Sequence, residues 1–272
     1  MKHTIAIVAA LAAAGAPATT ALIAQGHAGH DMSVHAALAG AIADPGRSEA
    51  SRARDAYRHP METLGFFGVK PGDRVVELLP GGGWYTEILA PYLAARGKLY
   101  DAMPAGAGQD RFRAKVAATP SWAKVAVVDL PAPAAQVPDG SVDVVLTFRN
   151  IHNLTIPGKG EDARVLASAF RMLKPGGTLG VVEHRLPESM DTALEARSGY
   201  LKVSTVRRIV EAAGFEYVGA SEVNANPKDT HDYPKGVWTL PPTYTEGDKD
   251  RARYTAIGES DRMTLKFRKP LK

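Results

Sequence analysis

The sequence predicts an α/β protein with a doubly wound, Rossmann-like fold, built on a mostly parallel seven-stranded sheet. Apolar runs of strand length alternate with segments of helical spacing along most of the chain, a pattern typical of a parallel sheet covered by helices on both faces. The first apolar run leads through Gly81, Gly82 and Gly83 into a helical segment, as strands do where they open onto a ligand-binding turn. The 272 residues, 45% of them hydrophobic, can fill the core of one such domain.

Helices are expected before the sheet. Residues 35–43 and 49–57 form two short helices separated by the helix-breaking sequence Asp-Pro-Gly at 44–46. A third helix starts at His59-Pro60, with proline in its first turn, and ends at Gly68.

The strands and helices of the sheet region follow in alternation. Each expected strand is a short apolar run bounded by turn residues, and the seven cover residues 74–79, 97–103, 124–130, 144–148, 173–184, 217–223 and 261–270. The helices between them cover 84–95, 112–118, 162–173 and 203–213. No helical signal separates the last two strands, which indicates that they are antiparallel.

An irregular insertion, residues 224–261, precedes the last strand. It is rich in proline, glycine, aspartate and aromatic residues and has no clear periodicity. Segments of this length more often cover a binding site than simply connect two elements. The sequence therefore predicts a lid that carries Lys228, Asp229, His231 and Trp238, with an extended flap on the sheet edge as an equal alternative.

The N-terminus has the features of a secretory signal peptide. A short basic start precedes an apolar stretch that is too short to span a bilayer, and small residues follow it. We expect a signal peptide over residues 1–24, a disordered mature N-terminus over 25–34 and a single domain over 35–272. No second long apolar run follows, so we expect a soluble periplasmic protein with no membrane insertion after cleavage.

Composition excludes several classes of protein. The chain has no cysteine, which rules out disulfides and thiolate chemistry. Its net charge of +4 is spread along the chain without a basic tract, so no nucleic-acid partner is expected. No metal-binding spacing of histidines is present, so no metal is expected. The sequence gives no indication of the oligomeric state.

Three phrases of the sequence and one acid, read in order, resemble class I S-adenosylmethionine (SAM) methyltransferases. The first phrase is VVELLPGGGWYTEIL, the acid closes the second strand, and VDVVLTFRNIHNL and LKPGGTLGVVEH follow. More narrowly, RHPMETLGFFGVKPGD, NANPKD and VWTLPP resemble a group of exported bacterial proteins described as predicted methyltransferases. The resemblance implies a methyltransferase fold. It places Glu77, Gly81 and Gly83 at the methionine end of SAM, Asp101 at the ribose and Asp129 near the adenine.

The glycine loop departs from the family pattern. Leu79 stands where the first glycine is expected, Pro80 removes a backbone donor, and Trp84 and Tyr85 bring two rings to the mouth of the loop. A branched side chain at the first position would crowd the ligand. The triple glycine is thus consistent with a cofactor pocket, with a pocket given over to substrate, or with a simple tight turn.

Polar residues gather after the fourth and fifth strands, at the expected ligand edge of the sheet. Arg149, Asn150, His152 and Asn153 follow the fourth strand, and His152 is the candidate general base, with Arg149 stabilising an oxyanion. The fifth strand ends in Glu183, His184 and Arg185, and Tyr200 lies just beyond it. Because side chains alternate along a strand, at most one of Glu183 and His184 should enter the cleft.

These observations favour a cofactor-independent enzyme on the methyltransferase fold. SAM is made in the cytoplasm, and a chain exported unfolded cannot carry it along. We therefore expect an acid/base lyase that releases a small aldehyde such as formaldehyde, by a retro-aldol step, from a small phenolic or lignin-derived aromatic in aromatic catabolism. The chain also resembles phenylcoumaran γ-formaldehyde lyases. The alternatives are a SAM-dependent methyltransferase of a small molecule and a non-catalytic periplasmic protein that binds aromatics.

Overall fold

The computed structural model describes residues 32–155 and 161–272. The expected signal peptide and residues 25–31 of the expected disordered segment lie outside these ranges. Residues 32–42 are helical, so regular structure is already present three residues before the expected domain boundary at 35. Within the described ranges, no helix is long and apolar enough to cross a membrane.

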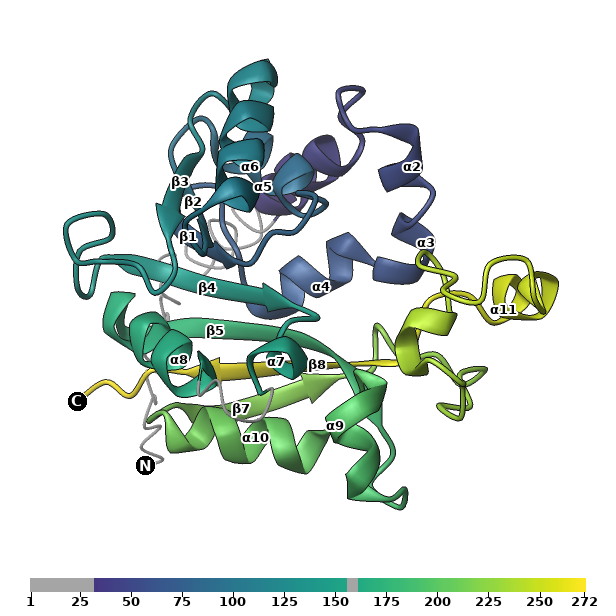
Figure 1. Ribbon diagram of the computed structural model, residues 1–272. Helices are drawn as coiled ribbons and strands as arrows, with labels where there is room; N and C mark the ends of the chain where they lie inside the picture. The colour runs from purple at the N-terminus through teal and green to yellow at the C-terminus, as the bar shows by residue number, and fades with distance from the viewer. Residues whose placement is uncertain (1–31, 156–160) are drawn as a thin grey trace, which may run out of the picture.

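The core of the molecule is one sheet, whose strands follow one another from β3 at the top to β7 at the bottom of Figure 1. Five parallel strands come first in the order β3-β2-β1-β4-β5, and β8 and β7 extend the sheet beyond β5. Both added pairings, β5 with β8 and β8 with β7, are antiparallel. The strands are β1 (Arg74–Leu78), β2 (Lys98–Met103), β3 (Ala126–Asp129), β4 (Val142–Phe148), β5 (Leu173–Leu186), β6 (Leu201–Lys202), β7 (Glu216–Ser221) and β8 (Arg262–Arg268).

The predicted fold class is confirmed, with one difference in the number of strands. The sheet has eight strands among the described residues, because the short β6 pairs in parallel with the end of β5. Two residues are too few to give a periodic signal, which explains why β6 was missed in the sequence.

Helices cover both faces of the sheet. The helix at 32–42, α4 and α5 pack on one face through Leu38, Leu64 and Ile88, and α8 and α10 pack on the other through Leu166 and Val206. The helices are α2 (Glu49–Arg52), α3 (Asp55–Arg58), α4 (Pro60–Phe67), α5 (Thr86–Leu93), α6 (Ala107–Ala118), α7 (Ile151–Leu154), α8 (Glu161–Met172), α9 (Glu195–Ser198), α10 (Val203–Ala212) and α11 (Arg251–Ile257).

Two expected elements differ in detail. The helix expected over 49–57 is broken into α2 and α3 by a turn at residues 53–54. The insertion 224–261 is not irregular throughout, because it contains a 3₁₀ helix (Gly236–Thr239) and α11. Tyr254 of α11 packs on Tyr233 and Leu240 of the same insertion, so a small local core stabilises a helix that is too short to be stable alone.

The segments before and after the sheet meet at its ligand edge. Figure 1 shows α2, α3 and the part of the chain around α11 gathered beyond the carboxyl ends of β4 and β5. Arg54 and Arg58 form ion pairs there with Glu259. This arrangement places residues from both ends of the described chain around one site.

Candidate active site

The loop between β1 and α5 keeps the backbone shape of a glycine-rich turn. Leu79 has φ of 54° and Gly81 has φ of 60°, both in the left-handed region. A Cβ atom added to Gly81 or Gly82 would meet no atom within 4 Å, so the backbone of the loop faces open space. Leu79 thus adopts the conformation expected of the glycine that it replaces.

Two side chains fix this loop in place. The amide nitrogen of Asn150 donates hydrogen bonds to the carbonyl oxygens of Leu78 (3.3 Å) and Leu79 (3.2 Å). The Nζ of Lys115, on α6, donates to the carbonyl oxygen of Gly82 at 2.7 Å. These contacts hold the loop in its open shape.

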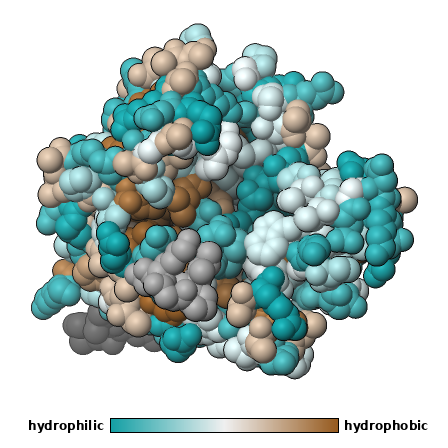
Figure 2. Space-filling view, viewed as in Figure 1, coloured by the Kyte–Doolittle hydropathy of each residue, from teal (hydrophilic) through white to brown (hydrophobic). Residues whose placement is uncertain are grey.

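Two cavities lie on either side of the loop. The first, here called the loop cavity, has a volume of about 560 Å³ and a largely apolar wall that includes Met103, Leu130 and Val165. Figure 2 shows hydrophobic side chains gathered in a hollow on this face of the molecule, over the region of β1 and β4 in Figure 1. A volume of this order is typical of sites for small molecules and cofactors.

The second cavity, here called the arginine cavity, has a volume of about 490 Å³. It is lined by Arg54 and Arg58 from the two ends of α3, by Arg149 after β4, and by the rings of Trp84 and Tyr85. The two cavities share the residues Leu79, Gly81, Asn150 and Asn153 in their walls. They are therefore adjacent chambers that meet at the glycine loop and the end of β4.

His152 and Glu183 form a hydrogen-bonded pair at the edge of the arginine cavity. Nδ1 of His152 lies 2.9 Å from Oε1 of Glu183, and the backbone N–H of His152 donates to Oε2 at 3.2 Å. The Glu183 side chain is fully buried, whereas His152 lines the cavity. The carboxylate thus favours the tautomer with a proton on Nδ1, which leaves Nε2 able to accept a proton.

His184 lies beside His152, with 5.3 Å between the ring centroids. Its Nδ1 is 2.6 Å from the Oγ of Ser260. Burial, together with nearby His152, lowers the pKa of His184 well below its usual value, so its ring is neutral at physiological pH. His184 lines the cavity and Glu183 lies behind it, the division expected from alternation along β5.

Together, His152, Glu183 and His184 offer ligand atoms within 4.8 Å of one another, a grouping that could hold a metal ion. The sequence placed these residues at one edge of the sheet but predicted no metal there. However, Glu183 already accepts bonds from the His152 ring, the His152 backbone and the His184 backbone. These donors occupy the carboxylate, and the geometry fits an oriented histidine base better than a metal centre.

The acidic residues carried over from the family do not lie where the resemblance implies. Asp101 is fully buried and accepts a hydrogen bond from the Thr86 hydroxyl, as does Glu77, with which it is in register. Asp101 lines neither cavity, because β2 continues past it to Met103. Glu77 lines the arginine cavity.

Asp129 and Gly83 also lie away from the positions that the resemblance implies. The two oxygens of Asp129 accept hydrogen bonds from Gln109 (3.0 Å) and Gln136 (2.9 Å), and the residue lines neither cavity among those described. A Cβ at Gly83 would lie 2.6 Å from the Trp122 ring. Gly83 therefore allows helix packing and does not face a ligand.

Arg185 and Tyr200 have structural roles. Arg185 forms two hydrogen bonds to Asp261 (2.8 and 2.9 Å) and pairs with Glu222. Tyr200 is fully buried and its hydroxyl donates to Asp229 at 2.9 Å. Neither residue lines the cavities around the loop.

Of the four expected lid residues, only Trp238 reaches the arginine cavity. Its ring packs edge-on against His152, with 6.0 Å between centroids. Asp229 and His231 are buried in a polar network that fixes the insertion, since Asp229 also accepts bonds from the backbones of His231 and Asp261. Lys228 is exposed. Of the four residues expected in the lid, the structure thus places one, the aromatic Trp238, in the wall of the arginine cavity.

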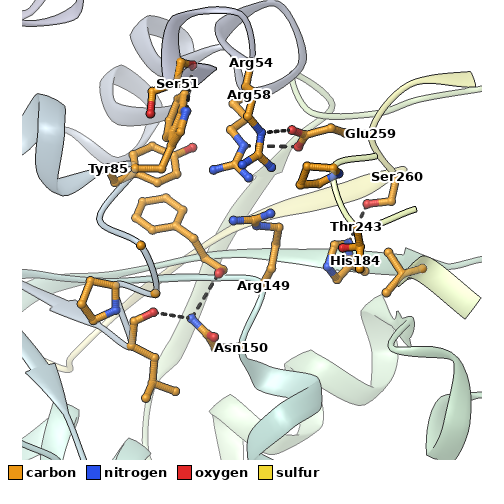
Figure 3. Close-up of a pocket in the computed structure, with 18 of the residues that line it drawn as sticks. Ser51, Arg54, Arg58, Tyr85, Arg149, Asn150, His184, Thr243, Glu259 and Ser260 are labelled. Carbon is orange, nitrogen blue, oxygen red and sulfur yellow. Dashed lines mark hydrogen bonds and ion pairs between the residues drawn. The ribbon is translucent and has the colours of Figure 1, made fainter. Parts of the chain in front are cut away.

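Several residues of the arginine cavity were missed in the sequence. Figure 3 shows Arg54, Arg58 and Glu259 together above Arg149, with Tyr85 at the side of the cavity. Phe148 stacks on Tyr85, with 3.5 Å between ring centroids and 10° between planes. The only available signal was the spacing of Arg54 and Arg58, four residues apart, which places them on one side of a helical segment.

The electrostatics of this cavity are dominated by arginine. Burial opposes ionisation of Glu259, but Arg262, Arg58 and Arg54 lower its pKa to about 2. Burial lowers the pKa of Arg149 to about 10. Burial, followed by the charge of Arg149, lowers the pKa of Arg58 well below its usual value. The guanidinium groups thus repel one another inside a partly desolvated space.

Sequence comparison identifies related proteins over part of the chain. A family model described as a methyltransferase domain matches residues 76–181. The chain is 34% identical over 130 residues to the ubiquinone/menaquinone biosynthesis C-methyltransferase UbiE of Ectopseudomonas mendocina, covering 46% of this chain and 47% of that protein. It is 26% identical over 167 residues to the UbiE protein of Cronobacter sakazakii, covering 61% and 64%. The matches therefore span about half to just under two thirds of these curated relatives.

Solved structures show the same fold. A SAM-dependent methyltransferase from Aquifex aeolicus superposes with a TM-score of 0.50 at 22% sequence identity, covering 63% of this chain and 87% of that chain. A structure described as a sarcosine dimethylglycine methyltransferase of Galdieria sulphuraria gives a TM-score of 0.52 at 15% identity, covering 81% and 85%. At these identities the likeness concerns the fold alone.

Proposed function

The chain belongs to the class I SAM-dependent methyltransferase superfamily, and from this premise we propose that it transfers a methyl group from SAM to a small aromatic acceptor. The observation that carries the proposal is the meeting of two cavities at Asn150 and Asn153, with the His152 base in the wall of the arginine cavity. A methyl transfer needs adjacent sites for donor and acceptor, with a base beside the acceptor.

The predicted lyase activity is wrong. The matched family model and the curated relatives are methyltransferases, and no match supports a lyase or a role in aromatic catabolism. The preference for a cofactor-free reaction has no support either, since a methyltransferase domain implies the use of SAM. The same matches favour an enzyme over a non-catalytic binding protein.

The loop cavity fits SAM in size and in the open backbone of the loop. Gly81 and Gly82 leave space for a ligand to approach the main chain, and the apolar wall with Met103 and Leu130 fits a flat base. The expected ribose carboxylate is absent from this wall, because Asp101 is turned into the core. When bound, SAM supplies an electrophilic methyl group.

The residues of the arginine cavity then prepare the acceptor. Nε2 of His152 removes a proton from a phenolic hydroxyl, which makes the oxygen and the neighbouring ring carbons more nucleophilic. Buried Glu183 holds the ring and stabilises the imidazolium that forms. The rings of Tyr85, Phe148 and Trp238 line the site and give the acceptor an apolar surface.

Thermal unfolding with S-adenosylhomocysteine tests the proposal. A ligand at a hundredfold excess over its dissociation constant stabilises the native state by about 2.7 kcal/mol, which corresponds to a rise in Tm of roughly 5–10 °C for a chain of this size. Gly81→Asn should abolish the rise, because asparagine tolerates the left-handed backbone while its side chain enters the cavity.

The matched control is Gly140→Asn. Gly140 has φ of 59° and equally open surroundings but lies in neither cavity. This variant should keep the full rise in Tm. A wild-type protein whose Tm does not respond to millimolar S-adenosylhomocysteine would reject the proposed function.

A further inference from the structure

The arginine cavity has more positive charge than its own residues neutralise. Arg54, Arg58 and Arg262 all pair with Glu259, and Arg149 adds a further cation. The other carboxyls of the cavity wall are Glu87 and Glu77, and the pKa of Glu77 is raised well above its usual value, chiefly by burial and then by Asp101. Glu259 and Glu87 are therefore left to offset Arg54, Arg58 and Arg149 of the wall and the neighbouring Arg262.

Two of these guanidinium groups lack partners for their outer nitrogens. Arg58 is 1% exposed, yet its Nη1 and Nη2 have no hydrogen-bond partner among the described residues. Its one ion pair runs through Nε to Glu259 at 3.2 Å. No hydrogen bond or ion pair engages the Arg149 side chain in the described part of the chain, and Figure 3 shows its guanidinium turned toward Arg58. Buried charged groups left in this way are costly unless a ligand satisfies them.

The backbone at Arg149 supports a role in binding. Arg149 has φ of 63°, a strained conformation for an arginine, and residues held in such conformations cluster at functional sites. Its own N–H donates to the carbonyl of Val182 at 2.7 Å. The end of β4 is thus fixed while the side chain enters the cavity.

The floor of the cavity is aromatic. Tyr85 stacks on Phe148 beside the two arginines, and burial raises the pKa of Tyr85 to about 12, so its hydroxyl stays protonated. A flat apolar body fits against these rings, and an oxyanion attached to it would reach the guanidinium groups.

We propose that the arginine cavity binds its acceptor through an oxyanion, a carboxylate or a phosphate, held between Arg58 and Arg149. This inference rests on the proposed function in one respect, which is that the ligand of this cavity is the acceptor. The outer nitrogens of the two arginines form the recognition element, and Glu259 holds Arg58 in position.

Calorimetric titration without SAM tests the binding of three probes. Benzoate carries a carboxylate, benzamide is its neutral isostere, and inorganic phosphate carries the other oxyanion. We expect benzoate or phosphate to bind and benzamide to bind at least tenfold more weakly than benzoate. The tighter of the two anions identifies the oxyanion that the site prefers.

Variants locate the binding to the cavity. Arg149→Gln should weaken anion binding at least tenfold, and Arg149→Lys should restore part of it, because charge returns without the planar fork. Arg207→Gln is the matched control, since Arg207 lies exposed on α10, paired with Glu211. It should leave anion binding unchanged. Far-ultraviolet circular dichroism and Tm show whether each variant is folded.

Three results would overturn the inference. They are equal binding of benzamide and benzoate, unchanged anion binding in a folded Arg149→Gln variant, and full displacement of benzoate by S-adenosylhomocysteine. The last would assign the arginines to the carboxylate of the cofactor. Anion binding that meets the first two tests in a protein that ignores S-adenosylhomocysteine would instead reject the methyltransferase proposal and keep the anion site.

Discussion

Leu79 and Arg149 are both left-handed non-glycine residues, and they follow adjacent strands at the carboxyl edge of the sheet. Each lies in a cavity wall, and Leu79 lies in both. The energy stored in such residues is about 1–3 kcal/mol each. The loop after β1 therefore keeps the backbone conformation of a cofactor-binding loop, although its first glycine position is occupied by Leu79.

Replacing Leu79 with glycine should tighten the binding of S-adenosylhomocysteine several-fold. Glycine removes both the left-handed strain and the side chain that lines the two cavities. Calorimetric titration measures the effect, and Leu79→Ala is the matched control, since it shortens the side chain but keeps a Cβ. If Leu79→Gly binds no better than wild type, the leucine does not limit the cofactor site.

His152→Ala should lower kcat about 10²–10⁴-fold, the usual contribution of a general base. The assay is release of S-adenosylhomocysteine with an aromatic acid that the wild type methylates. Binding of S-adenosylhomocysteine should not change, because His152 does not line the loop cavity. His35→Ala, at an exposed helical position, should keep full activity. An unchanged kcat in His152→Ala would assign the proton transfer to another group.

Among the elements, β1 and β2 contain a buried pair of carboxyl groups. Glu77 and Asp101 are in register, and the Thr86 hydroxyl of α5 lies between them. Burial raises the pKa of Asp101 to about 7 and that of Glu77 in the same direction. The pair therefore takes part in the stability of the sheet rather than in cofactor binding.

This pair should make the protein less stable as the pH rises from about 4 through 7. A carboxyl whose pKa is higher in the folded state than in the unfolded state stabilises the fold at low pH, and that stability is lost as the group ionises. Asp101→Asn should reduce the difference in unfolding free energy between pH 5 and pH 8, as measured with urea. Asp248→Asn, at an exposed site, should keep the wild-type difference, and equal pH dependence in both variants would contradict the pair's role.

The contact between β5 and α4 depends on Gly180. A Cβ at this position would lie 2.7 Å from the Phe67 ring and 2.8 Å from Leu146. Gly180→Ala should lower the free energy of unfolding by about 1–3 kcal/mol, the usual cost of overpacking a core. Gly219→Ala in β7 adds the same methyl group in open space and should have little effect on denaturant unfolding. Equal stability of the two variants would show that α4 can shift.

For the whole molecule, the order of strands and helices could be predicted because periodicity is a local property of the sequence. His152, Asn150 and Arg149 could be placed at the ligand edge for the same reason, since they directly follow an apolar strand. The buried position of Asp101 could not be predicted, because it depends on the residue at which β2 ends. Arg54 and Arg58 were missed because their partner, Glu259, is 205 and 201 residues away.

Export of the chain stays a prediction. If residues 1–24 are a signal peptide, the protein purified from its natural source should begin at Gln25. Intact-mass measurement and N-terminal sequencing decide this point, and cell fractionation should find the protein in the periplasm. A purified protein that retains residues 1–24 would reject the leader and remove the conflict between secretion and the use of cytoplasmic SAM.

The position of β8 between β5 and β7 has a consequence for synthesis. A ribosome makes this strand after the other described strands, yet it fills an inner place in the sheet, and Glu259 just before it completes the arginine cluster. Until residues 259–268 emerge, β5 and β7 have exposed edges, and Arg54 and Arg58 lack their ion-pair partner. A nascent chain therefore lacks the residue that holds Arg58 in position, and its open sheet edges are what a chaperone would bind.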